Sequence, residues 1–112
     1  MYEYKAEIID VYDGDTVTAK VDLGFHISFQ NSFRLLGINA PEVRGDEKDN
    51  GIKSRDALRS LIMNRKVIIK TEKDKKEKYG RYLATILFDI GDKVISVNDW
   101  MVENGYAVYQ DY

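Results

Sequence analysis

The sequence predicts an α+β fold in which a small closed β-barrel carries one main helix and a second, short helix near its C-terminal end. Eight Tyr and four Phe stand against one Pro among 112 residues, and this composition favours strands. Apolar and polar residues alternate with period two through several short segments, and the period becomes helical only after residue 51 and again near residue 97. A chain of this length is expected to form one domain, here residues 1–112.

Three strands are predicted before the main helix. Residues 3–11 alternate weakly and end at an Asp-Gly pair, which is a strong turn signal. Residues 16–23 place their apolar side chains on one face at period two, as expected of a half-buried strand. Residues 25–38 supply the third strand, with an interruption expected at 31–32. These three strands should form a meander.

Two helices are predicted in the remaining chain. Apolar residues at helical spacing indicate the main helix over about 53–64. Ser96 followed by Asp99 resembles a capping box, in which a side-chain oxygen accepts a backbone hydrogen bond at the start of a helix. We therefore expect a short late helix over about 97–104, with Gly105 as its C-terminal stop.

Two further strands complete the predicted sheet. They lie at 66–70 and 81–88 and flank a charged connection at 71–78. Five strands with a helix after the third match the five-stranded OB-fold best among small β-barrels. Closure of the barrel also removes exposed strand edges from a short chain.

Composition limits the classes of function. The 17 basic and 19 acidic side chains give a net charge of −2, so any contact with nucleic acid must depend on local positive charge. The absence of cysteine excludes a disulfide framework and thiolate chemistry. No apolar run approaches the roughly 20 residues that span a bilayer, and no signal peptide opens the sequence. We expect no membrane partner and, by default, a cytoplasmic location, with the oligomeric state left open.

Polar residues gather where the predicted strands meet turns. Asp13 and Asp15 flank a glycine, and the common reason for such residues is a turn in which Asp accepts backbone hydrogen bonds. Their carboxylates are also oxygen ligands suited to Ca²⁺ or Mg²⁺. Asn39 and Glu42 bracket an Ala-Pro pair that either only ends a strand or presents an amide ligand and a water-handling carboxylate.

Two arginines have both an ordinary and a functional interpretation. Arg34 lies within an apolar strand, where its stem can snorkel to solvent. Arg81 starts a strand and can be a solvated hairpin residue. If either faces a pocket, its forked donors match phosphate oxygens.

Three segments together carry a resemblance to a known family. They are DGDT at 13–16, FRLLGINAPE at 33–42 and KYGRYLA at 78–84. In this order and spacing they resemble the staphylococcal nuclease (thermonuclease) family over about residues 8–107. The resemblance implies an OB-fold and Ca²⁺-dependent hydrolysis of phosphodiester bonds in DNA and RNA, with little sequence specificity.

The resemblance also implies a metal site. Ca²⁺ would be held by the Asp15 carboxylate, by the amide oxygen of Asn39 and by the backbone carbonyl of Ala40, with Asp13 supporting these ligands from behind. The family usually has Asp where this chain has Asn39. An amide oxygen can bind Ca²⁺ but brings no charge, so metal binding is expected to be weaker.

The same resemblance implies the catalytic residues. Glu42 would be the general base or the carboxylate that orients water, and Arg34 and Arg81 would bind the reacting phosphate. Lys78 and Tyr79 would contact a neighbouring phosphate. Because all three catalytic positions are kept, an active Ca²⁺-dependent nuclease is the favoured interpretation. The alternative is a weak or inactive OB-fold module that binds nucleic acid or a protein partner.

Overall fold

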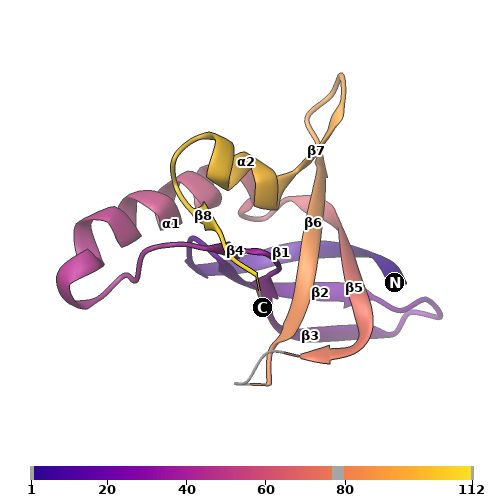
Figure 1. Cartoon of the computed structure of the whole chain (residues 1–112). Helices are drawn as coiled ribbons and strands as arrows, with labels where there is room; N and C mark the ends of the chain where they lie inside the picture. The colour runs from indigo at the N-terminus through magenta and orange to yellow at the C-terminus, as the bar shows by residue number, and fades with distance from the viewer. Residues whose placement is uncertain (1, 77–79, 112) are drawn as a thin grey trace.

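The barrel is built from five strands that close on themselves. The computed structural model describes residues 2–76 and 80–111. The sheet order is β3-β2-β1-β5-β6, and a parallel pairing of β3 with β6 closes it (Figure 1). These strands are β1 (Tyr2–Asp13), β2 (Thr16–Asp22), β3 (Ser28–Leu35), β5 (Lys66–Lys76) and β6 (Tyr82–Asp89). The predicted five-stranded α+β barrel is confirmed.

The other elements extend or cover this barrel. Figure 1 shows both helices gathered on one side of it, with β4 and β8 running side by side nearby. None of the helices in the described part of the chain is long and apolar enough to cross a membrane. The elements are β4 (Ile38–Asn39), the 3₁₀ helix η1 (Gly45–Glu47), α1 (Lys48–Ile62), β7 (Val94–Ser96), α2 (Val97–Glu103) and β8 (Val108–Tyr109).

The core forms where the period-two faces of the strands meet the apolar sides of the helices. Leu58 and Ile62 of α1 are fully buried, as are Val97 and Met101 of α2. Their spacing of four residues places each pair on one side of its helix. The strands contribute the alternating residues Ala6, Ile8, Val11, Val17, Ala19, Val21, Phe33, Leu35, Val67, Ile69, Ala84 and Ile86.

Several predicted boundaries were wrong. The main helix begins at Lys48 rather than at residue 53, and it ends at Ile62 rather than at residue 64. Strand β5, the fourth barrel strand along the chain, was predicted to end at residue 70 but continues to Lys76, which pairs with Tyr82 of β6. The third predicted strand is broken at Leu36-Gly37 instead of at 31–32, because the turn needs a positive φ of 81° at the glycine.

The late helix agrees with its prediction within one residue. The Ser96 side chain accepts a hydrogen bond from the amide of Asp99 at 3.3 Å and so caps the first turn. The Asp99 carboxylate does not complete the box but accepts from the hydroxyl of Tyr109 at 3.1 Å. The helix therefore helps to hold β8, which pairs with β4 and was not predicted.

Asn98, the second residue of α2, connects this helix to β6 and to the turn between β3 and β4. Its side-chain nitrogen donates to the carbonyl oxygens of Leu36 at 2.9 Å and Ala84 at 3.1 Å. Its oxygen accepts from the amide of Ile86 at 3.1 Å. Only 4% of the Asn98 surface is exposed, so these bonds are shielded from water. They fix the turn that joins β3 to β4.

Replacing Asn98 by alanine should lower the free energy of unfolding by about 2–3 kcal/mol, because three backbone groups lose a buried partner at once. Chemical denaturation measures this loss. Asn104→Ala removes a single exposed bond to Trp100 from the end of the same helix, and it should cost less than about 1 kcal/mol. Similar losses in the two variants would contradict the role given to Asn98.

Candidate active site

The turn between β1 and β2 places a buried carboxylate at one end of the barrel. The two strands pair as far as Asp13 and Thr16, so Asp15 lies in the turn. Its amide donates to Asp13 Oδ1 at 3.1 Å, and its carbonyl accepts from the amide of Leu35 in β3 at 2.8 Å. Asp15 is only 5% exposed. The turn is therefore tied to β3, and its carboxylate lies inside the fold.

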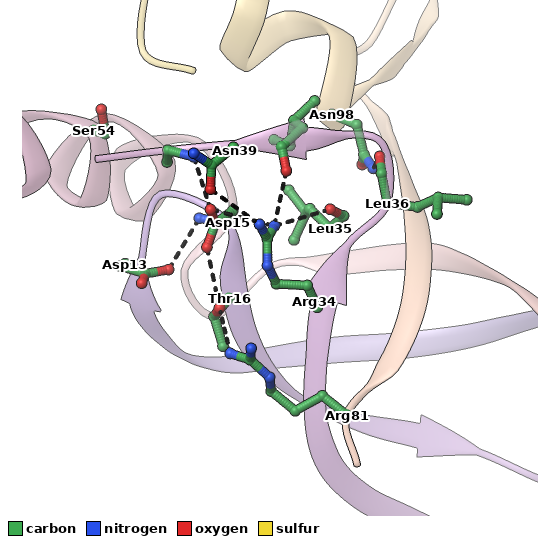
Figure 2. Close-up of polar contacts among 12 residues, drawn as sticks. Asp13, Asp15, Thr16, Arg34, Leu35, Leu36, Asn39, Ser54, Arg81 and Asn98 are labelled. Carbon is green, nitrogen blue, oxygen red and sulfur yellow. Dashed lines mark hydrogen bonds and ion pairs between the residues drawn. The ribbon is translucent and has the colours of Figure 1, made fainter. Parts of the chain in front are cut away.

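Arg34 lies beside this carboxylate, because the register of β2 with β3 brings the start of β2 opposite it. Its Nη1 is 3.2 Å from Asp15 Oδ2 and donates to the carbonyls of Leu35 at 3.2 Å and Ile38 at 3.0 Å. Its Nη2 donates to Asn39 Oδ1 at 3.3 Å. Figure 2 shows the guanidinium enclosed by these groups. It thus joins the turn, the end of β3 and β4 at one point.

Thr16 links the third predicted motif to the same carboxylate. Arg81 Nη1 donates to Thr16 Oγ1 at 3.1 Å, and Thr16 Oγ1 donates to Asp15 Oδ1 at 3.2 Å. Arg81, which is partly exposed, directly precedes β6, the strand that closes the barrel against β3. Both guanidinium groups therefore reach Asp15, one directly and one through a hydroxyl (Figure 2).

The segment after β4 lies against the same group. The amide of Ala40 donates to Asp15 Oδ2 at 2.7 Å. Glu42, two residues further on, is exposed, and within the described part of the chain no hydrogen bond holds its carboxylate. The fold brings together Asp13, Asp15, Arg34, Asn39, Ala40 and Arg81, whereas Glu42 is linked to them only as the second residue after Ala40 in the chain. Lys78 and Tyr79 lie outside the described residues.

The Asp15 carboxyl is electrostatically strained. Burial raises its pKa from 3.8 to about 7, and the hydrogen bond and charge of Asp13 add to the rise. The Ala40 amide and the Arg34 guanidinium oppose it, since both favour the charged form. Because burial is the largest cause of this rise in pKa, a further positive charge beside Asp15 would favour its ionised form.

The donor set suits a hard cation. In residues 2–76 and 80–111, no cluster of three or more His, Cys, Asp or Glu side chains could hold a metal ion. The available donors are instead two carboxylates, of Asp13 and Asp15, with the amide oxygen of Asn39 and the carbonyl of Ala40. All are oxygen atoms, the ligands that Ca²⁺ prefers. A cation would also supply a positive charge beside Asp15, so these residues fit Ca²⁺ by their chemistry.

Close packing behind the site was not predicted from the sequence. A Cβ at Gly14 would lie 2.7 Å from the Cβ of Ala40 and 2.8 Å from the Cβ of Ser54 in α1. Ser54 is buried, and its hydroxyl donates to the carbonyl of Tyr106 at 2.6 Å. An Asp-Gly pair signals a turn, but nothing local in the sequence signals that this turn touches a helix forty residues away. The link through Thr16 was missed for the same reason.

The fold and this site define a family. A sequence model described as "Staphylococcal nuclease homologue" matches residues 32–112, which is more than half of the chain. The chain belongs to the staphylococcal nuclease homologue family. The match begins within β3 and includes every later helix and strand, and hence Arg34, Asn39 and Arg81.

Individual relatives are similar to three quarters or more of the chain. The "Uncharacterized protein MJ1439" of Methanocaldococcus jannaschii is 30% identical over 93% of this chain. The endonuclease YhcR of Bacillus subtilis is 29% identical over 94% of it, and the thermonuclease of Staphylococcus hyicus is 29% identical over 75%. The chain spans 58%, 9% and 48% of these three relatives, respectively.

Proposed function

We propose that this chain is a nuclease domain that hydrolyses phosphodiester bonds of DNA and RNA with Ca²⁺ and with little sequence specificity. The observation that carries the proposal is the convergence of Arg34 and Arg81 on the Asp15 carboxylate, beside the segment that bears Glu42. Membership of a nuclease homologue family supports it, as do relatives named endonuclease and thermonuclease.

Each donor around Asp15 has a place in the proposal. The Asp15 carboxylate, the Asn39 amide oxygen and the Ala40 carbonyl would hold Ca²⁺, and Asp13 would fix the turn through its bond to the Asp15 amide. When bound, Ca²⁺ supplies positive charge that neutralises a phosphate oxygen and favours ionisation of water.

The protein's own side chains would handle the water and the phosphate. Glu42 is exposed and would orient a water molecule and accept its proton. Arg81 is partly exposed and would donate to the phosphate oxygens, where charge grows as the phosphorus becomes five-coordinate. Arg34 would hold Asp15 and Asn39 in place and face the phosphate from inside the fold. Contacts to phosphate carry no base information, which accounts for the low specificity.

A second candidate function follows from Asn39. This residue is neutral, and its oxygen accepts a hydrogen bond from Arg34 at 3.3 Å. The side chain of Asn39 therefore has a hydrogen-bond partner within the protein, although the ligand position carries an amide and not a carboxylate. Such a site suits a module that binds nucleic acid or a protein partner without cleaving it.

The test is cleavage of end-labelled single-stranded DNA and of the matching RNA, with Ca²⁺ and with excess chelator. We expect cleavage with Ca²⁺ that stops in chelator. A Glu42→Ala variant purified in parallel controls for contaminating nuclease. Absence of cleavage at high Ca²⁺, combined with binding of the same oligonucleotide in chelator, would favour the binding module.

The Asn39→Asp substitution should tighten Ca²⁺ binding by about ten- to a hundredfold, because an added ligand charge increases affinity for the ion. Isothermal titration calorimetry measures the change. Gln30→Glu adds the same charge on β3, four residues or about 13 Å from Arg34 along the strand, and it should alter the affinity little because of screening. Unchanged or weaker binding by the Asn39→Asp variant would mean that Asn39 is not a ligand.

A further inference from the structure

The position of Glu42 is fixed by its main chain. Its side chain is exposed and, among the described residues, is held by no hydrogen bond. The chain on either side is anchored. Two residues earlier, the Ala40 amide donates to Asp15 at 2.7 Å, and two residues later, Arg44 Nη2 donates to the hydroxyl of Tyr12 at 2.8 Å. The carboxylate therefore projects from a segment whose backbone is held at Ala40 and whose Arg44 side chain is bonded to Tyr12.

Gly51 supports this segment from below. It lies in the first turn of α1 and is buried. A Cβ at this position would overlap the carbonyl oxygen and carbon of Glu42 and would lie 2.8 Å from the amide nitrogen of Val43. All three of these atoms belong to the backbone, so no side-chain rotation relieves the overlap. Gly51 has no positive φ, and hence glycine is needed here for close approach rather than for an unusual conformation.

We propose that Gly51 is a positioning residue for Glu42: by letting α1 touch the Glu42–Val43 peptide, it sets where the carboxylate stands relative to Asp15 and the two arginines. This proposal rests on the proposed function for its effect on turnover. The contact itself stands on the packing alone. Because the helix also meets the β1–β2 turn through Ser54, it holds the Asp15 side and the Glu42 side of the site against one surface.

The activity test compares Gly51→Ala with wild type. We expect kcat to fall by about ten- to a hundredfold, as misplacement by about 1 Å can cost, while KM and Ca²⁺ affinity change much less. The control is Ile62→Val at the other end of α1, about 16 Å away, which loosens the core without touching Glu42. It should leave kcat unchanged for the folded protein.

A double substitution separates positioning from general damage. In a Glu42→Ala background, Gly51→Ala should cause no further loss of kcat, because there is no carboxylate left to misplace. Independent, multiplying losses in the double variant would overturn the proposal. Equal falls of kcat in Gly51→Ala and Ile62→Val would overturn it too.

A third measurement needs no activity. In backbone NMR spectra of the chelated protein, Gly51→Ala should shift the amide signals of Glu42 and Val43 more than those of other residues outside α1, and Ile62→Val should leave them in place. Unmoved Glu42 and Val43 signals would overturn the proposal. Shifted signals with an inactive wild type would support the contact and contradict the nuclease function instead. If Gly51→Ala does not fold, Tyr12→Phe removes one anchor without adding atoms, and it should also shift these signals and lower kcat.

Discussion

Replacing Arg34 by alanine should lower the free energy of unfolding by about 3–5 kcal/mol, because a buried carboxylate then loses its charged partner. The Nη1 to Oδ2 distance of 3.2 Å joins two side chains that are 9% and 7% exposed. The same substitution removes the guanidinium that donates hydrogen bonds to the carbonyls of Leu35 and Ile38. Chemical denaturation in excess chelator measures the loss without any contribution from a bound metal.

The destabilisation by Arg34→Ala should also grow with pH. The pKa of Asp15 is raised from 3.8 to about 7, and Arg34 opposes this rise, so the pKa of Asp15 should be higher still in the variant. A carboxyl whose pKa is raised by folding contributes stability that is complete below 3.8 and is lost as the pH rises through the folded-state value. Above about pH 7, the free energy of unfolding of the variant continues to fall with pH, whereas that of wild type no longer does. The difference in free energy of unfolding between the two proteins should therefore be larger at pH 8 than at pH 5.

Arg55 supplies the control for Arg34. It forms an ion pair with Asp56 at 3.2 Å, but the two side chains are 27% and 59% exposed. Exposed pairs contribute about 0–1 kcal/mol, so Arg55→Ala should cost no more than this at either pH. If Arg34→Ala lowered the free energy of unfolding as little as Arg55→Ala, the buried ion pair of Arg34 with Asp15 would not be stabilising the fold.

The barrel is predictable from the sequence because each strand covers the core with one face, and a two-residue period is visible wherever the other face is polar. The pattern fails at the end of β3. There Phe33, Arg34 and Leu35 are all buried. The β1–β2 turn and β4 lie against Arg34 on the face that the pattern leaves to solvent. An arginine in an apolar strand predicts a side chain on the face away from the core. Whether that face is exposed to solvent depends on contacts with residues that are distant in sequence.

The start of α1 illustrates the same limit. Residues 48–52 carry no apolar period, and Asn50 and Gly51 are poor helix formers, so the sequence predicts a later start. The first turn forms nonetheless, because Gly51 packs against the backbone at Glu42. Tertiary contact overrides local propensity here, and it does so at the point where the helix meets the site. The order of the motifs, in contrast, pointed to Arg34, Asn39 and Arg81, which lie around Asp15 in the structure, but not to Thr16.

Substituting alanine for Glu42 should reduce kcat by about 10²–10⁴, the usual contribution of a positioned base. The reason is that the Glu42 carboxylate differs from the buried polar groups around Asp15 in its exposure to solvent. The buried groups are already engaged with one another through short contacts, whereas the Glu42 carboxylate is exposed and, in the described chain, is held by no hydrogen bond. It is therefore the carboxylate of the segment that a water molecule can reach.

The effect should fall on kcat rather than on KM, because an interaction with the attacking water is made mainly in the transition state. Stability should change by less than about 0.5 kcal/mol, as expected of an exposed side chain. Steady-state cleavage of an oligonucleotide with saturating Ca²⁺ measures kcat and KM, and Glu47→Ala, which removes another exposed carboxylate five residues away, is the matched control. A Glu42→Ala variant as active as Glu47→Ala would show that the water is handled elsewhere, and the roles of Arg34 and Arg81 would then have to be tested without it.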